Sequence, residues 1–340
     1  MKFDFAIGNP PYHEEVENNG RPAPVYNSFM EEAFKIAGCV EMITPARFLF
    51  NAGQTPKAWN AKRLSDKHFK VVDYQPDAST VFPNTDIKGG VAITLRDENK
   101  NFGEIGIFTE FNELNSIRNK VWSGSEQASL SEICIGAVPY RYTELLKSEH
   151  PEWIELAGES FDLRTNALDN LHGKIFFENK PKEMGFVKIY GLYNKKRAAL
   201  WIAQKYVDGP NNFGKHKLLI SKANGAGSFG EALSSMIYAE PNSGHTQSFI
   251  SIGSFENTTE VSNVEKYIKT KFARGLLSIL RITPDMTPYK WKYVPLQDFT
   301  SNSDIDWSQS ISNIDQQLYA KYGLDDKEKE FIENHVKEME

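Results

Sequence analysis

Residues 3–12 constrain the fold more than any other part of the sequence. They read Phe-Asp-Phe-Ala-Ile-Gly-Asn-Pro-Pro-Tyr, and the apolar residues that alternate over 3–7 predict a short buried strand. Gly8 allows a sharp turn, and the two prolines after Asn9 restrict that residue to an extended or turn conformation. We therefore predict a rigid strand-to-loop corner that displays the Asn9 amide and the aromatic ring of Tyr12.

The sequence after this corner alternates between helical and extended patterns. Two helices are predicted over 25–37 and 54–67, and three strands over 39–43, 69–74 and 91–95, the last preceded by a turn at Gly89-Gly90. This alternation is typical of an α/β sheet. It fades from about Asn99, and we place a domain boundary between residues 110 and 130.

The string Asn9-Pro10-Pro11-Tyr12, directly after a strand, resembles motif IV of the class I amino-methyltransferases that use S-adenosylmethionine. This group includes adenine-N6 DNA methyltransferases as well as glutamine and RNA guanine N-methyltransferases. The resemblance implies that the Asn9 side-chain oxygen and the Pro10 carbonyl accept the N–H groups of a planar amino nitrogen and so free its lone pair. It also implies S-adenosylmethionine as the cofactor, with Asn9 contacting only its methyl end. Positioning and electrostatic stabilisation supply the catalysis in such a scheme.

Further segments resemble the large adenine methyltransferases of restriction–modification systems, the Eco57I-like group. They are Asp86-Ile-Lys-Gly-Gly90, Lys271-Phe272, the stretch 291–299 and an acidic helix over 311–339. The resemblance implies a partial class I, Rossmann-like methyltransferase sheet in residues 1–115, which is the carboxyl-terminal half of a catalytic domain. It also implies a mixed α+β domain that recognises the target in double-stranded DNA over residues 130–300, followed by a C-terminal helix over 311–339.

A second motif implies the other side of a base-binding pocket. Val81-Phe82-Pro83-Asn84 resembles motif VIII of the same family, in which an aromatic ring stacks on one face of the target base. Phe82 is thereby implied as one wall of a pocket for a flipped-out adenine, with Tyr12 as the other wall. The alternative, that Phe82 is a core residue of a loop, stays open.

Two basic stretches stand out in a chain whose net charge is −6. Residues 174–222 hold 11 Lys or Arg against 3 Asp or Glu, residues 266–292 hold 7 against 1, and both interleave aromatic residues. Local positive charge favours contact with DNA phosphates, although a solvated protein surface gives the same pattern. The predicted DNA-binding residues are Lys195, Lys196, Arg197, Lys222, Lys271 and Arg274.

Other patterns are weaker. Gly225-Ala-Gly-Ser-Phe-Gly230 matches a nucleotide-binding loop, but only a short segment separates it from Pro241. The hydrolase-like pattern inside the same stretch has no recognisable His/Asp partner. Pro76-Asp77 with Asp86-Ile-Lys88 imitates a nuclease motif, but it lies where a methyltransferase hairpin is expected. No histidines have metal-binding spacing, so we predict no metal.

The cellular setting follows from cysteines and hydropathy. Cys39 and Cys134 lie far apart in the sequence, which suits a reducing compartment rather than a disulfide framework. No apolar run approaches the length of a membrane span. We therefore expect a cytoplasmic protein with no membrane partner.

The resemblance also exposes a gap. In the adenine group, the Gly-rich loop and the acidic residue that hold the methyl donor precede motif IV, and here the motif IV strand begins at residue 3. We expect a preceding segment or a second polypeptide to supply the donor site. The leading hypothesis is the adenine-N6 methyltransferase part of a restriction–modification enzyme. The alternatives are a DNA-recognition module or inactive fragment without its own catalysis, and a glutamine or RNA N-methyltransferase, which the long remainder of the chain disfavours.

Overall fold

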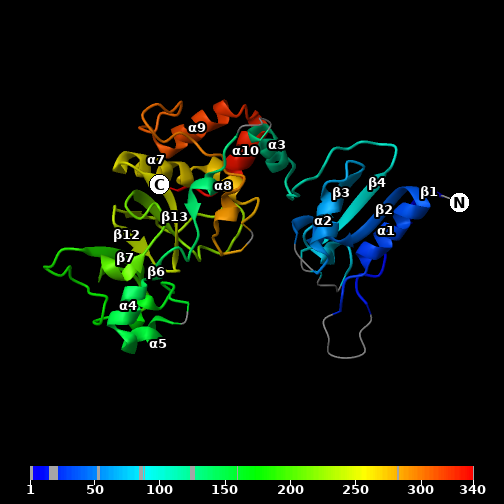
Figure 1. Cartoon of the computed structure of the whole chain (residues 1–340). Helices are drawn as coiled ribbons and strands as arrows, with labels where there is room; N and C mark the ends of the chain where they lie inside the picture. The colour runs from blue at the N-terminus through cyan, green and yellow to red at the C-terminus, as the bar shows by residue number, and fades with distance from the viewer. Residues whose placement is uncertain are drawn as a thin grey trace. The chain divides into compact units, whose positions relative to one another are not determined.

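The computed structural model of the protein describes residues 3–14, 22–51, 54–83, 87, 89–122, 127–158, 160–281 and 283–339. Asn84, Asp86 and Lys88 of the predicted motifs lie outside these residues. The chain folds into two compact units, residues 1–115 and 116–340, which can be followed along the colour bar of Figure 1. No helix in the described ranges is long and apolar enough to cross a bilayer.

In its described residues, the first unit contains a four-stranded sheet. The strands are β1 (Phe3–Gly8), β2 (Ala37–Pro45), β3 (Phe69–Gln75) and β4 (Val91–Asp97), in the order β1-β2-β4-β3. β1 and β2 are parallel, and β4 runs antiparallel to both β2 and β3. The carboxyl ends of β1, β2 and β3 therefore meet at one end of the sheet, together with the start of β4. The mixed α/β architecture predicted from the alternation is confirmed.

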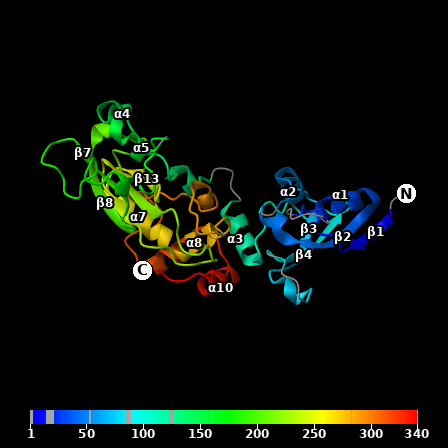
Figure 2. The same ribbon diagram turned by 90° about the horizontal axis from the view of Figure 1, so that it is seen from below.

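Helices cover one face of this sheet. α1 (Tyr26–Ile36) and α2 (Lys57–Leu64) both lie on that face in Figure 2, and the 3-10 turns η1 (Ala46–Phe50) and η2 (Ala78–Thr80) follow β2 and β3. Met30 of α1, Val40 of β2 and Trp59 of α2 are among the buried side chains of the shared core. The core thus holds the strand ends in place, and it extends into η1 after β2, where Phe48 is fully buried.

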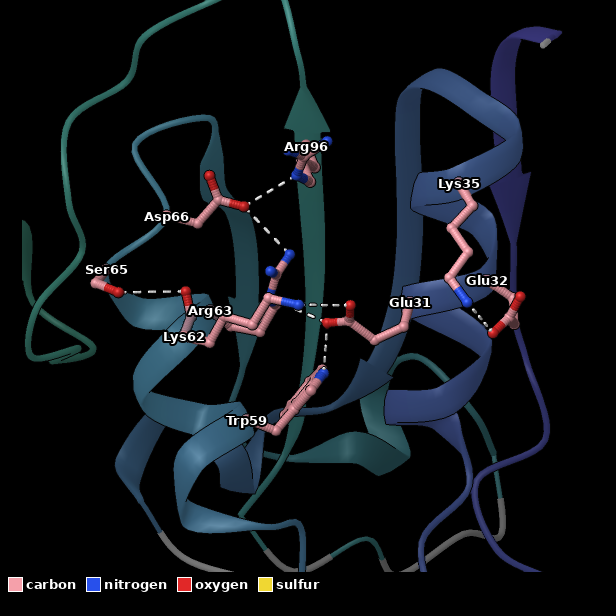
Figure 3. Close-up of polar contacts among 9 residues, drawn as sticks. All are labelled: Glu31, Glu32, Lys35, Trp59, Lys62, Arg63, Ser65, Asp66 and Arg96. Atoms are coloured by element: carbon pink, nitrogen blue, oxygen red, sulfur yellow. Dashed lines mark hydrogen bonds and ion pairs between the residues drawn. The ribbon is translucent and has the colours of Figure 1, made fainter.

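Charged side chains tie α1, α2 and β4 together (Figure 3). The Glu31 carboxylate accepts a hydrogen bond from Trp59 Nε1 at 2.8 Å, and the Arg63 guanidinium lies 3.4 Å from Glu31 and 3.2 Å from Asp66. Arg96 Nε donates to the same Asp66 carboxylate at 2.9 Å. Arg63 is only 4% exposed and lies between two carboxylates, so removing either one leaves a buried charge less well compensated, which is destabilising.

β1 is an edge strand, and its apolar side chains are not buried as predicted. Phe3, Phe5 and Ile7 are 59%, 72% and 81% exposed, whereas Ala6 packs against the core. In the described part of the chain β1 pairs only with β2, so its outer edge and the face with the three large side chains stay uncovered. Alternation shows that one face of a strand is apolar, but it does not show that the same chain covers that face.

The second unit combines sheets and short helices. One sheet of its described residues has the strand order β11 (Ile237–Ala239), β10 (His216–Ser221), β13 (Phe249–Phe255) and β5 (Cys134–Ile135). A second has the order β12 (Ser243–His245), β7 (Phe186–Tyr193) and β8 (Lys196–Ala203). A third pairs β6 (Arg141–Tyr142) with β9 (Val207–Asp208). The remaining α-helices are α3 (Asn112–Val121), α4 (Glu144–Glu149), α5 (Ile154–Ala157), α6 (Ala167–Asn170), α7 (Thr258–Lys269), α8 (Lys271–Leu277), α9 (Ile311–Lys321) and α10 (Asp326–His335). The 3-10 turns are η3 (Leu130–Ile133), η4 (Pro151–Trp153), η5 (Gln204–Tyr206) and η6 (Pro288–Trp291).

The C-terminal residues form α9 and α10 rather than the single helix predicted over 311–339. Gly323 ends the first helix with a φ of +63°, and Asp325 caps the second by accepting the Glu328 N–H at 3.1 Å. These helices also pack within the second unit, because the buried Asp315 carboxylate of α9 accepts two backbone N–H groups at the start of α8, at 3.0 and 2.9 Å. Residues 311–339 are therefore an integral part of that unit and not a separate appendage.

His245 makes the stability of the second unit depend on pH. Its ring is fully buried, and burial lowers its pKa from 6.5 to about 4. Below pH 6.5 the unfolded state therefore binds more protons than the folded state, and stability falls as the pH falls toward 4. In urea unfolding we expect the wild type to lose roughly 3 kcal/mol more than His245→Gln between pH 7 and pH 4. Equal losses in the two proteins would contradict a buried neutral imidazole.

Candidate functional site

The predicted catalytic corner lies at the carboxyl end of the first sheet. β1 pairs with β2 up to Gly8, and the chain then leaves the sheet through Asn9, which is exposed, and Pro10, which is buried. Tyr12 is half-buried, and its carbonyl accepts the Val25 N–H at 3.2 Å, next to the start of α1. The Asn9 amide is thus displayed on a short loop whose backbone is anchored on both sides.

Phe82 reaches the same end of the sheet from the other edge. It follows β3, its N–H donates to the Ala78 carbonyl at 2.8 Å, and its side chain is half-buried. β1 and β3 are the two edge strands, so three strand spacings separate their ends by about 14 Å. The sheet therefore brings Tyr12 and Phe82 to one end, on loops that start from opposite edges.

The turn at Gly89-Gly90 closes this end beside β3. Gly90 has a φ of +73°, and a Cβ at this position would lie 2.2 Å from the Gln75 carbonyl oxygen. Only glycine fits such a close backbone approach in the left-handed conformation. The predicted turn is confirmed, and it sets where β4 begins relative to the loops of the site.

Three buried polar atoms near the corner have no hydrogen-bond partner within the described residues. They are the Tyr12 hydroxyl, Asn27 Oδ1 in the first turn of α1, and Thr44 Oγ1 near the end of β2. Burial raises the pKa of the Tyr12 phenol, so its hydroxyl stays protonated and able to donate. Since buried polar groups are nearly always paired, these atoms fit a site that a polar ligand or ordered water completes.

Lys195 and Lys196 lie at the tip of the hairpin that joins β7 to β8. Asn194 and Lys195 have φ values of +50° and +62°, the left-handed conformation of a tight two-residue hairpin turn. Both lysine side chains are exposed. Both therefore have the accessibility that a phosphate contact needs, as does the neighbouring Arg197, which is also exposed.

Arg197 and Lys222 are instead engaged with protein atoms. The Arg197 guanidinium donates at 2.7 to 3.0 Å to serines within residues 221–235. Lys222 Nζ lies 3.8 Å from the Asp285 carboxylate. Arg197 therefore holds the hairpin to the neighbouring segment through its two terminal nitrogens, which makes these donors less available for a phosphate.

Lys271 and Arg274 correct the sequence prediction most clearly. The ammonium group of Lys271 lies 2.5 Å from the Glu333 carboxylate. Arg274 is 1% exposed, and its guanidinium donates to the backbone carbonyls of residues 230, 231, 269 and 337. Arg274 therefore cannot contact DNA in this structure, and the prediction for it is wrong.

The rest of the second basic stretch is similarly engaged. Six of the seven basic residues of 266–292 have ion pairs or hydrogen bonds within the protein. The count of charges in the sequence is correct, but it does not reveal that these side chains point to backbone carbonyls and carboxylates. Exposed Lys174 and Lys182, together with the hairpin tip, are better placed for phosphate contact.

The Gly-rich loop over 225–230 binds a carboxylate of its own chain. Glu231 accepts the N–H groups of Ala226 and Gly227 at 2.9 and 2.7 Å and forms an ion pair with Arg281. Residues 231–236 adopt no helical conformation after the loop. Because the loop amides are already used, this geometry supports setting the nucleotide-loop interpretation aside.

Comparison with known proteins shows what the first unit is similar to. Residues 1–82 match the family model described as Eco57I restriction-modification methylase, which supports the Eco57I-like resemblance over this part of the chain. An uncharacterized adenine-specific methylase of Mycoplasma pneumoniae is 30% identical over 118 residues. The alignment covers 33% of this chain and 28% of that protein, so the chain spans little more than a quarter of its relative.

Two solved structures show a distant likeness over most of the chain. The type IIG restriction endonuclease BpuSI is 10% identical with a TM-score of 0.34, covering 92% of this chain and 48% of that one. The type IIL restriction-modification enzyme MmeI, solved in complex with DNA, is 10% identical with a TM-score of 0.33, covering 97% and 56%. Such TM-scores are too low to establish a shared fold.

Proposed function

We propose that this chain is part of a cytoplasmic, site-specific adenine-N6 DNA methyltransferase of a restriction–modification enzyme. In this proposal the first unit carries the catalytic corner, and residues of about 130–300 contact the DNA target. The observation that supports it is that the family match and the strand ends of the sheet both include the Asn9 corner. The family match covers residues 1–82, and within them Asn9-Pro10-Pro11-Tyr12 lies where three strand ends of the sheet meet.

Asn9 and Pro10 act on the amino group of the base. The lone pair of an exocyclic amino nitrogen is delocalised into the ring, which makes it a poor nucleophile. Two acceptors aimed at its N–H groups favour a tetrahedral nitrogen and stabilise the charge that develops there. Asn9 is exposed at the corner and offers an oxygen of this kind, while the rigid prolines hold the adjacent carbonyl in place.

S-adenosylmethionine, when bound, supplies the methyl group. The described residues fit only part of this molecule. Exposed Asn9 suits the methyl end, and the Tyr12 hydroxyl, which has no hydrogen-bond partner within the described residues, offers a further polar group on the same loop. The Gly-rich loop of the second unit has its amides bound to Glu231 and does not fit the ribose and adenine of the donor.

Tyr12 and Phe82 are proposed to hold the flipped adenine between their rings. Their loops leave strand ends separated by about 14 Å, a spacing that leaves room for a base between two aromatic side chains. Extrusion from the duplex is required because the amino group of a paired adenine is not accessible to a methyl donor.

A further segment or a second polypeptide is proposed to bind the rest of the donor beside the open edge of β1. The purified chain alone should therefore bind S-adenosylmethionine too weakly to give heat in a calorimetric titration at micromolar protein, because the few residues at the methyl end bury too little surface. The exposed Phe3, Phe5 and Ile7 should also make it prone to aggregate. Micromolar affinity for the donor would show that these residues already contain a donor site.

Binding to duplex DNA should depend steeply on salt and on the hairpin tip. Replacing Lys195 and Lys196 by alanine should weaken binding to all sequences and reduce the slope of log affinity against log salt by about 2, one unit for each phosphate contact. Lys271→Ala is the matched control, since this side chain is paired with Glu333. Affinity that does not change with salt, or an equal loss in the control, would contradict this interface.

The alternative is a DNA-recognition module or an inactive fragment without catalysis of its own. It is favoured by one observation, the engagement of the Gly-rich loop amides by Glu231. A methylation assay distinguishes this alternative from the methyltransferase. The chain joined to a donor-binding segment should methylate DNA only if the corner is catalytic. Methyl transfer to RNA or to a glutamine side chain would instead support the remaining N-methyltransferase classes.

A further inference from the structure

The second unit contains a cavity that the proposed methyl transfer does not use. Its volume is about 710 Å³, and its lining comes from the segment after α4, the start of β7 and the end of β8. The lining includes the aromatic side chains Trp153, Phe177, Phe186 and Tyr206. This size and this mainly apolar lining are typical of small-ligand sites.

A hydrogen-bonded network holds one wall in place. The imidazole of His150 stacks on the Trp153 ring with 3.8 Å between centroids. The Tyr206 hydroxyl lies 3.0 Å from His150 Nε2 and 2.7 Å from the Glu149 carboxylate. The wall is therefore fixed before any ligand arrives, which reduces the entropy lost on binding.

Another part of the lining is held in place by backbone pairing. Phe177 exchanges two backbone hydrogen bonds with Trp201 of β8, at 2.9 and 2.8 Å. The rings of Phe177 and Phe186 lie 6.3 Å apart in an edge-to-face arrangement. Two rigid aromatic walls that face one cavity suit a planar ring.

The rim combines an apolar side chain with charged groups of both signs. Met184 lines the cavity and is 97% exposed, although methionine is usually buried. Lys174, Lys205 and the acidic Glu183 line it as well. Lys205 donates to Glu149 at 2.6 Å, and its ammonium group has two further N–H donors.

We propose that this cavity binds a single unpaired nucleotide. The base lies between the aromatic walls under Met184, and Lys174 and Lys205 bind its phosphate. A bare anion would not stack on the aromatic rings, and an uncharged apolar ligand would not form ion pairs with the lysines. The bases of an intact duplex are stacked on one another, so the nucleotide is either free or part of a single strand. Methyl transfer and the first unit play no part in this binding.

The test uses the full chain and three probes: deoxyadenosine monophosphate, inorganic phosphate and a short single-stranded oligonucleotide. The methyl resonance of Met184, assigned from Met184→Leu, should shift with both nucleotide probes because of the ring current of the base. Calorimetry should show saturable binding that Trp153→Leu weakens by at least about 10-fold and Lys174→Ala by about 3-fold, with the alanine variant less sensitive to salt. Tyr289→Ala is the matched control, because this exposed aromatic residue lies outside the cavity lining and should bind normally.

The outcomes separate cleanly. Tighter binding of the oligonucleotide than of the mononucleotide assigns the ligand to single-stranded nucleic acid, and equal affinity assigns it to a free nucleotide. The proposal is overturned if phosphate shifts Met184 and competes as well as the nucleotide, or if Trp153→Leu and Lys174→Ala, both folded by thermal unfolding, bind as the wild type does. These results leave the proposed methyl transfer untouched, since that is measured through Asn9.

Discussion

Asn9→Ala is expected to reduce the turnover number for DNA methylation by at least about 100-fold in the enzyme joined to its donor-binding segment, with DNA affinity changed less than twofold. In the proposed mechanism the amide interacts with the amino group mainly during reaction, so its loss should raise the barrier without weakening the ground-state complex. Its exposure at the end of β1 means that the substitution leaves no cavity in the core.

The matched control for this prediction is Asn99→Ala, an exposed asparagine in the same unit beyond the end of β4. Turnover is measured with a radiolabelled donor, and DNA affinity is measured separately by fluorescence anisotropy. A near-normal turnover number for Asn9→Ala would contradict the catalytic role proposed for this residue. A parallel loss of DNA affinity would point to a structural role instead.

Arg274→Ala is expected to destabilise the second unit by about 3–5 kcal/mol without any specific change in DNA contacts. The guanidinium is 1% exposed and satisfies backbone carbonyls from three separate parts of the chain, near residues 230, 269 and 337. Its removal leaves these carbonyls buried without donors and opens a space in the core. Unfolding in urea, followed by tryptophan fluorescence, measures the effect.

Lys196→Ala is the control for the arginine variant, since an exposed lysine at the hairpin tip should leave stability within about 0.5 kcal/mol. The two substitutions should therefore have opposite consequences: the arginine change affects folding, and the lysine change affects DNA affinity. Normal stability of Arg274→Ala combined with weaker DNA binding would instead support the prediction, made from charge alone, that Arg274 contacts DNA.

Local patterns predicted the elements near the corner well. The alternation over 3–7, the glycine and the paired prolines are interactions between neighbours in sequence, and the structure has β1 ending at Gly8. The turn at Gly89-Gly90 was also readable, since a left-handed turn favours glycine. The division of the C-terminal region into α9 and α10 could have been read from Gly323 followed by Asp325 and Glu328, a stop signal and a capping box.

Exposure and side-chain direction could not be predicted in the same way. Phe3, Phe5 and Ile7 carry the pattern of a buried strand, but burial depends on what covers the outer face of β1. Arg274 and Lys195 contribute equally to a charge count, yet one points into the unit and the other into solvent. The cavity beside β7 and β8 is lined from segments far apart in the sequence, which come together only in the fold.

We propose that the corner at Asn9 methylates the amino group of adenine in DNA, and one experiment on the reaction product tests this. The most direct measurement is mass spectrometry of nucleosides from unmethylated genomic DNA incubated with the donor and with the enzyme joined to its donor-binding segment. We expect N6-methyldeoxyadenosine with the wild-type chain and none above background with Asn9→Ala. Methylation that appears only on cytosine, on RNA or on protein, or adenine methylation that persists in the Asn9 variant, would contradict it.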